Sequence, residues 1–301
     1  IGIYCAARVL GKKAQIVLDQ VTSSLRPLKE GFTTEKGYPP DMFVSSERAL
    51  ELTDYNTLVM VVDVNRPSHT ECPGLLKRTD SIVVFDHHRQ SSEVISNPVL
   101  SYIEPYASST CEMVAEVLQY FSENIKLAPH EADCIYAGIL IDTSNFMTKT
   151  GVRTFEAAAY LKRCGAEVTR VRKMLRNDMD AYKARAEVVR HAEVYRGAFA
   201  ISICPADKIE SPTIVGAQAA DELLNIVGIK ASFVLTEYQG KIYVSSRSID
   251  EINVQKIMER LGGGGHLNMA GCQLRDCTVS QAQRIIEDTI DEMLEEGDIE
   301  E

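Results

Sequence analysis

The sequence predicts an α/β fold, in which a doubly wound parallel sheet domain is joined by a helical connector to a smaller mixed α/β domain. Strand-like apolar runs alternate with helix-like segments through the first half of the chain. Three apolar runs end in acidic or imidazole side chains, as strands do at the ligand-binding edge of a parallel sheet. The length of 301 residues exceeds what one hydrophobic core usually supports, so two domains are expected.

The first domain is expected over residues 1–177 and alternates helices with strands. Helices are expected at residues 3–10, 46–52, 111–121 and 129–141, and strands at residues 14–18, 57–63 and 82–86. Gly11 ends the first helix, since glycine is common just past a helix C-terminus. Ser109 and Glu112 are spaced as in a capping box, in which the glutamate reaches back to the serine backbone.

The composition changes after about residue 177, where a charged segment with strong helical propensity begins. A connector helix is therefore expected over residues 178–197, and a second domain over residues 198–301. Its strands are expected at residues 199–203, 231–236 and 241–248, and its helices at residues 215–226, 254–261 and 279–294. Gly240 lies in the turn between the last two strands, as glycine does in tight hairpins.

The overall composition is that of a folded soluble protein, with 45% apolar and 25% charged residues. No apolar run approaches the roughly 18 residues of a membrane span, and no signal peptide is expected. The eight cysteines are scattered without a Cys-x-x-Cys pair, so reduced thiols and a cytoplasmic location are expected.

The net charge of −11 is concentrated at one end, because residues 287–301 carry nine acidic and no basic side chains. The rest of the chain is nearly neutral and can still gather basic residues around an anionic ligand. Little basic excess remains for following a nucleic-acid backbone, so a long nucleic acid is not expected as a partner.

The candidate site comes from the ends of the three apolar runs. Residues 57–63 end in Asp63, residues 82–86 end in Asp86 and lead into His87 and His88, and residues 138–142 end in Asp142. Carboxylate and imidazole groups together suit Mn²⁺ or a similar divalent ion, and the lack of cysteine disfavours a structural zinc site.

These segments resemble known motifs. The stretches Val62-Asp63-Val64-Asn65-Arg66, Asp86-His87-His88 and Gly138-Ile139-Leu140-Ile141-Asp142-Thr143 resemble the second, third and fourth motifs of the DHH phosphoesterase superfamily, in the same order. Near the other end, residues 262–271 resemble the glycine-rich signature of the DHH-associated substrate domain. Within the superfamily, the chain is most similar to the catalytic part of GdpP-type cyclic-di-AMP phosphodiesterases.

The resemblance implies roles for the residues of the first domain. Asp63 would be a bridging metal ligand, and His87 and Asp142 would complete the shell of one ion. Asp86 would orient His87 or its neighbour, and His88 would face the scissile phosphate as a donor or proton carrier.

The resemblance also implies two Mn²⁺ ions in a complete family member. The first motif of the superfamily, His-x-x-x-Asp-x-Asp, is not found in this sequence, which begins at Ile1 in what resembles the helix after that motif. One ion or none, and doubtful turnover, are therefore expected for this chain by itself.

The second domain is expected to hold phosphate. The glycine run at residues 262–265 is expected as a loop whose backbone N–H groups can approach an anion, and an arginine suits bidentate phosphate contact. Arg247 and His266 are expected to contact phosphate. The remaining members of the expected pocket are Ser246, Asn253, Gly263, Gly264 and Gly265.

By resemblance, the expected function is Mn²⁺-dependent hydrolysis of cyclic-di-AMP to linear pApA. Two alternatives stay open: a short-oligonucleotide or phosphoadenosine phosphatase of the same superfamily, and a nucleotide-binding module without turnover. The expected partner is a cyclic or short linear dinucleotide. The resemblance leaves room for a homodimer and for a longer parent protein anchored in the membrane with this part in the cytoplasm.

Overall fold

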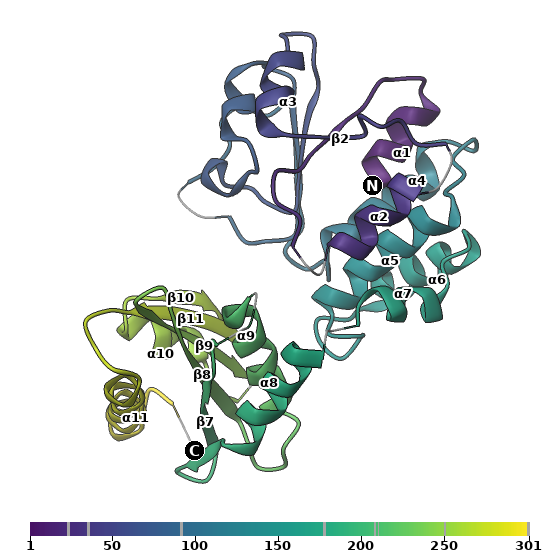
Figure 1. The fold of residues 1–301 in the computed structure, drawn as a ribbon. Helices are drawn as coiled ribbons and strands as arrows, with labels where there is room; N and C mark the ends of the chain where they lie inside the picture. The colour runs from purple at the N-terminus through teal and green to yellow at the C-terminus, as the bar shows by residue number, and fades with distance from the viewer. Residues whose placement is uncertain are drawn as a thin grey trace. The chain divides into compact units, whose positions relative to one another are not determined.

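The computed structural model describes residues 1–301 except 23–24, 35–36, 91–92, 177–178, 208, 210, 250 and 300–301. The chain divides into two compact units, Ile1–Arg176 and Asn177–Glu301 (Figure 1). The first unit holds parallel sheets and the second a mixed sheet, so the α/β class predicted from the sequence is confirmed. None of the helices in the described part of the chain has the length and apolar character that a membrane crossing needs.

The first unit contains a parallel sheet of three strands in the order β3 (Val59–Val62), β4 (Ile82–Asp86) and β5 (Leu100–Ile103). The central strand is buried at every position, which explains its unbroken run of apolar residues. A second, two-stranded parallel sheet pairs β1 (Ile16–Val17) with β2 (Phe43–Val44). Because β3 and β4 are parallel neighbours, the residues that follow them emerge at the same sheet edge.

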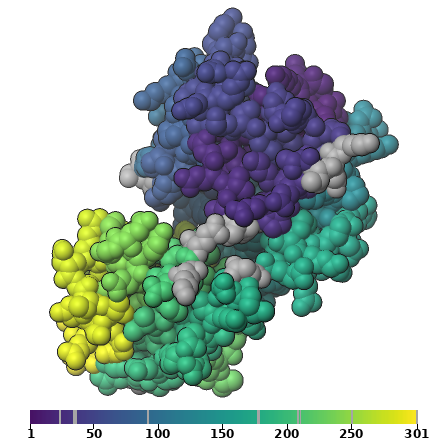
Figure 2. All heavy atoms as spheres, viewed as in Figure 1, coloured from purple at the N-terminus to yellow at the C-terminus, as the bar shows by residue number. Residues whose placement is uncertain are grey.

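Seven α-helices are described in the first unit: α1 (Gly2–Val9), α2 (Arg26–Thr34), α3 (Ser46–Leu52), α4 (Thr110–Phe121), α5 (Pro129–Asp142), α6 (Val152–Arg163) and α7 (Val168–Met174). Short 3-10 turns form at η1 (Pro67–His69) and η2 (Pro73–Lys77). Helix α5 lies among α4, α6 and α7, and its apolar residues form the core of this helical layer (Figure 1). The space-filling view shows the purple N-terminal segment at the surface of this unit (Figure 2).

The second unit is built on a six-stranded mixed sheet. Its strands, in spatial order, are β10 (Gly264–His266), β11 (Met269–Leu274), β9 (Lys241–Ser248), β8 (Ala231–Tyr238), β7 (Phe199–Cys204) and β6 (Glu193–Tyr195). Only β7 and β8 are parallel among these neighbours. Gln239 and Gly240 form the turn between β8 and β9 with positive φ angles of 51° and 71°, as a tight hairpin requires.

Helices cover both faces of this sheet (Figure 1). The helices are α8 (Met179–Arg190), α9 (Pro212–Leu223), α10 (Val254–Arg260) and α11 (Val279–Glu295). Phe233 and Leu235 pack with α10 and α11, whereas Val234 between them packs with α8 and α9. This alternation follows from the period of two along a strand.

The segment expected as a connector helix is shorter than the sequence suggested. The helix ends at Arg190, and residues 193–195 form the edge strand β6 instead of more helix. Ala184 and Val188 on α8 are buried in a core shared with α9 and the sheet. Through these apolar residues the helix α8 packs on the sheet of the second unit.

Candidate metal centre

The site begins at the ends of β3 and β4. Val62 pairs with Phe85, so Asp63 and Asp86 follow at the same edge, and the Asp63 N–H donates to the Phe85 carbonyl at 2.9 Å. Asp63 has a left-handed backbone conformation with φ of 67°, which aspartate tolerates better than most residues and which is frequent at functional sites.

Three side chains gather at this edge. His87 Nε2 lies 3.6 Å from Asp63 Oδ1, and the potential ligand atoms of Asp63, His87 and His88 all lie within 4.8 Å of one another. The Asp63 side chain is 57% exposed and that of His87 only 8%. The carboxylate is therefore open to solvent, while the imidazole is held in the protein.

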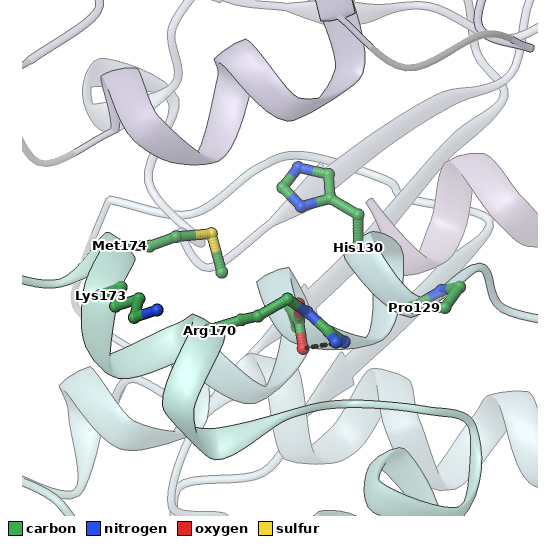
Figure 3. Close-up of a pocket in the computed structure, with 6 residues that line it drawn as sticks. Pro129, His130, Arg170, Lys173 and Met174 are labelled. Carbon is green, nitrogen blue, oxygen red and sulfur yellow. Dashed lines mark hydrogen bonds and ion pairs between the residues drawn. The ribbon is translucent and has the colours of Figure 1, made fainter.

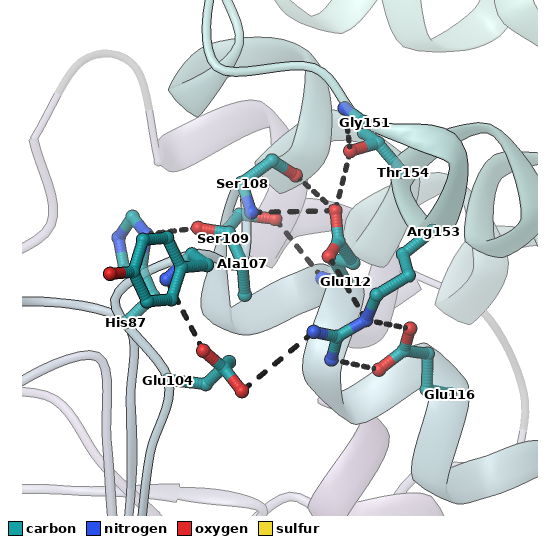
Figure 4. A network of polar contacts seen from close by, with 11 residues as sticks. His87, Glu104, Ala107, Ser108, Ser109, Glu112, Glu116, Gly151, Arg153 and Thr154 are labelled. Carbon is teal, nitrogen blue, oxygen red and sulfur yellow. Dashed lines mark hydrogen bonds and ion pairs between the residues drawn. The ribbon is translucent and has the colours of Figure 1, made fainter.

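One contact from the loop before α4 and one from the first residue of α4 orient this pair. His87 Nδ1 donates to the Ala107 carbonyl at 3.4 Å (Figure 4), and the Thr110 hydroxyl donates to Asp63 Oδ1 at 2.9 Å. Burial, followed by the nearby charge of His88, lowers the pKa of His87 below its ordinary value. A neutral imidazole with its proton on Nδ1 leaves the Nε2 lone pair for a cation.

Asp86 is fully buried and orients His88. The sequence left open whether Asp86 would orient His87 or its neighbour. Its Oδ1 accepts from His88 Nδ1 at 2.7 Å and from His88 N at 3.2 Å, and its Oδ2 accepts from Asn65 Nδ2 at 2.6 Å. Burial raises the pKa of Asp86, but the hydrogen bonds from His88 outweigh it, so the pKa lies below its usual value. The same contact raises the pKa of His88.

Asp142 is the last residue of α5 and lies partly buried. Burial, followed by the negative charge of Asp63, raises the pKa of Asp142 to about 6. Asp142 therefore lies within electrostatic reach of Asp63, although the compact group of three ligand atoms does not include it. A divalent cation would offset the repulsion between two carboxylates, so these residues fit such an ion.

The residues predicted to bind substrate lie in the second unit, where Arg247 pairs with a residue of α9 and Ser246 with the backbone of β11. Arg247 Nε donates to Asp221 Oδ1 at 2.8 Å, and the arginine side chain is 11% exposed. Ser246 is fully buried, and its hydroxyl donates to the Ala270 carbonyl at 2.9 Å. The Ser246 hydroxyl is therefore held by the backbone of the neighbouring strand β11.

The second half of the glycine run forms a strand, where the sequence suggested a loop throughout. Gly264 and Gly265 belong to β10, which pairs with β11. A Cβ on Gly263 would lie 2.2 Å from the Gly271 carbonyl oxygen, and one on Gly265 would lie 2.4 Å from that of Met269. These glycines are therefore required because two backbones approach closely.

The two other predicted residues lie at the ends of elements. His266 is exposed at the end of β10. The Asn253 side chain caps α10 by accepting from Lys256 N at 3.3 Å. Asn253 thus has a structural role that the sequence did not indicate.

A separate cavity of about 390 Å³ lies among the helices of the first unit (Figure 3). It is lined by Pro129, His130, Asp133, Arg170, Lys173 and Met174. Arg170 Nε donates to Asp133 Oδ2 at 2.6 Å within it, and His130 Nε2 lies 2.9 Å from the Leu28 carbonyl. None of its lining residues belongs to the candidate metal centre.

Sequence reasoning missed the groups that orient the metal-binding side chains. Asn65 and Thr110 both stand in segments that were recognised, but neither was given a role. The backbone carbonyl of Ala107 leaves no signal in a sequence, because every residue has one. The capping box predicted from Ser109 and Glu112 is only partly confirmed. Ser109 caps α4, but the Glu112 carboxylate accepts hydrogen bonds from Ser108 instead of the Ser109 backbone.

The fold and site thus define an α/β protein with a carboxylate and imidazole centre at the edge of a parallel sheet. Residues 2–139 match the DHH family, N-terminal domain, and residues 199–296 match the DHHA1 domain. The chain therefore belongs to the DHH family, as its motifs suggested.

Several relatives share long stretches of sequence with this chain. The cyclic-di-AMP phosphodiesterase GdpP of Geobacillus thermodenitrificans is 44% identical over 255 residues, which cover 84% of this chain and 39% of the relative. The GdpP of Bacillus subtilis is 39% identical over 303 residues, covering 99% of this chain and 46% of the relative. The chain thus spans less than half the length of these relatives.

Solved structures share the fold. An exopolyphosphatase-related protein from Bacteroides fragilis has a TM-score of 0.80 at 17% identity, covering 97% of this chain and 86% of that chain. RecJ from Thermus thermophilus has a TM-score of 0.55 at 16% identity, covering 95% of this chain and 54% of that chain. At these identities the likeness concerns the fold alone.

Proposed function

We propose that the protein to which this chain belongs hydrolyses cyclic-di-AMP to linear pApA, and that this chain supplies part of its metal centre. The observation that carries the proposal is the convergence of Asp63, His87 and His88 within 4.8 Å at one sheet edge. The substrate is supported by the relatives at 39% and 44% identity, which are named cyclic-di-AMP phosphodiesterases.

Asp63, His87 and Asp142 would hold a divalent ion, and Mn²⁺ suits their mixture of carboxylate and imidazole. When bound, such ions activate a water and neutralise charge on a phosphate. Thr110 fixes the Asp63 carboxylate, and Ala107 fixes the His87 ring, so both ligands are oriented before an ion arrives.

In the proposed reaction, a water oxygen bonds to phosphorus and releases one proton to solvent, the bond from phosphorus to the 3′ oxygen breaks, and the leaving oxygen takes up a proton. His88 is suited to supply that proton from Nε2, because Asp86 holds its Nδ1 and raises its pKa. Asp86 thus acts through His88 and does not itself touch the substrate.

In the second unit, Arg247 and His266 would contact phosphate. Arg247 is paired with Asp221, whose pKa is raised by burial more than the arginine lowers it. A phosphate would replace this carboxylate on the guanidinium. Gly263, Gly264 and Gly265 would support His266 by keeping β10 against β11, and Asn253 would fix the start of α10. The eight free thiols support a reducing compartment such as the cytoplasm.

The test is product chromatography with Mn²⁺ and cyclic-di-AMP, run on the longer protein that contains this chain and on its Asp63→Asn variant. Asp80→Asn is a matched control, because Asp80 is an exposed aspartate in the same unit, just before β4. The proposal expects pApA from the parent and from the control, but little from Asp63→Asn. Binding of cyclic-di-AMP without any pApA would replace the enzyme by a nucleotide-binding module.

A second candidate activity is favoured by a more distant relative. The bifunctional oligoribonuclease and PAP phosphatase NrnA of Mycoplasma genitalium is 28% identical over 221 residues, covering 71% of this chain and 68% of the relative. Adding pApA and pAp to the same assay separates the two candidates. Faster release of phosphate from pAp than of pApA from cyclic-di-AMP would favour the second.

A further inference from the structure

A buried carboxylate, that of Glu112, lies in the polar network that His87 joins through Ala107 (Figure 4). Glu112, in the first turn of α4, is 1% exposed. Its Oε2 accepts from the Ser108 hydroxyl at 2.5 Å and from the Thr154 hydroxyl at 2.6 Å, and the Ser108 N–H lies 3.4 Å away. Carboxylates are seldom buried this completely unless they are paired or hydrogen-bonded, and here two hydroxyl groups supply the hydrogen bonds.

The segment that Glu112 holds is the one that orients the metal ligands. Ser108 directly follows Ala107, whose carbonyl accepts from His87 Nδ1 at 3.4 Å. Two residues further on, the Thr110 hydroxyl donates to Asp63 Oδ1 at 2.9 Å. Residues 107, 108 and 110 are all buried, at 4%, 1% and 5% exposure, so this segment has little room to shift while Glu112 is in place.

Capping of α4 does not explain why the Glu112 carboxylate is buried. The N-terminus of α4 is capped by Ser109, whose hydroxyl accepts from the Glu112 N–H at 3.0 Å. The Glu112 carboxylate instead links this end of α4 to Thr154 in the first turn of α6. Two helix N-termini thus face one negative charge, which favours the buried carboxylate.

Arg153 is not its main partner either. Arg153 binds Glu116 with two hydrogen bonds of 2.7 Å, whereas its Nε lies 3.9 Å from Glu112 Oε1. Glu116 lies one turn further along α4, and among the described residues its carboxylate pairs with Arg153 and not with residues 107–110, so it provides a matched control for Glu112.

We propose that Glu112 is a positioning residue of the metal centre, which acts through Ser108 to keep the Ala107 carbonyl on His87 Nδ1 and the Thr110 hydroxyl on Asp63. The Ala107 contact selects the imidazole tautomer with the proton on Nδ1 and the lone pair on Nε2. The proposal rests on the metal centre of the proposed function, but not on the identity of the substrate.

The first measurement needs neither metal nor substrate. Nitrogen-15 NMR of the histidine rings in the metal-free protein, assigned with a His87→Gln variant, reports which nitrogen of His87 carries the proton. In the unsubstituted protein and in Glu116→Gln, that proton is expected on Nδ1. In Glu112→Ala the Ala107 contact is loosened, and a mixture of both tautomers is expected.

The second measurement is the Mn²⁺ affinity by calorimetry. Loss of a group that orients metal ligands typically weakens binding by about 10- to 100-fold, and this is expected for Glu112→Ala. Glu112→Gln keeps one carbonyl oxygen as an acceptor for Ser108 and Thr154, so it is expected to retain most of the affinity. Glu116→Gln should bind as the parent does.

The outcome that overturns the proposal is a folded Glu112→Ala protein with the parent's His87 tautomer and metal affinity. If Glu112→Ala does not fold, Ser108→Ala takes its place, because it removes the same link and leaves the Ala107 carbonyl intact. An unchanged tautomer in Ser108→Ala then overturns the proposal. If the parent itself binds no Mn²⁺, the proposed metal centre fails, whereas the tautomer measurement still decides the role of Glu112.

Discussion

Replacing Asp86 by asparagine tests the account of the buried carboxylate beneath the site. Asp86 is fully buried and accepts three hydrogen bonds from two partners, Asn65 and His88. An asparagine offers one acceptor oxygen, and its NH₂ group must face either the Asn65 amide or the His88 donors. One buried donor then lacks an acceptor, and the charge-assisted bond to His88 is lost.

The expected loss in the free energy of unfolding is about 1.5–3 kcal/mol, the usual worth of a hydrogen bond to a charged group. Urea unfolding of the metal-free chain, followed by circular dichroism, measures it. Asp80→Asn is the control, since Asp80 is exposed and its change is expected to stay within about 0.5 kcal/mol. An Asp86→Asn protein as stable as this control would refute the reasoning about the buried acceptor.

Three further predictions concern the affinity for metal, the affinity for nucleotide and the stability of the sheet in the second unit. Asp63→Asn is expected to lower Mn²⁺ affinity at least about tenfold in calorimetry, because a charged ligand is lost; unchanged affinity would remove Asp63 from the centre. Arg247→Ala should weaken cyclic-di-AMP binding about 10- to 100-fold and leave Mn²⁺ binding unchanged, whereas exposed Arg284→Ala should alter neither. Gly265→Ala should cost about 1–3 kcal/mol of stability because its Cβ meets the neighbouring strand, whereas Gly264→Ala, with open space, should be mild; equal melting temperatures would contradict the close approach.

Two of the elements that build the site could be predicted from the sequence because they are buried on nearly all sides and therefore appear as unbroken apolar runs. Strand β4 is buried at all five positions and therefore appears as an unbroken apolar run that ends at Asp86. Helix α5 is buried on most sides and gives a similar run before Asp142. Parallel pairing of β3 with β4 then brings Asp63 to the same edge, as the rule for parallel sheets predicts.

Other elements gave no such signal. Strand β5 is short, and its first two residues, Leu100 and Ser101, are exposed, so no apolar alternation marks it. The glycine run predicts a loop because such runs are usually flexible, whereas Gly264 and Gly265 lie in β10, and the close approach of β11 leaves no room for a Cβ on Gly265. The link from Glu112 to Thr154 joins residues 42 positions apart, which only the packing of α4 against α6 brings together.

The most direct test of the central claim is anomalous X-ray scattering at the manganese edge from crystals of the protein grown with Mn²⁺. The account predicts a peak within about 2–2.4 Å of an Asp63 carboxylate oxygen and of His87 Nε2, with Asp142 turned toward it. A protein saturated with Mn²⁺ that shows no peak at this sheet edge, or holds its ion through other residues, would contradict the account.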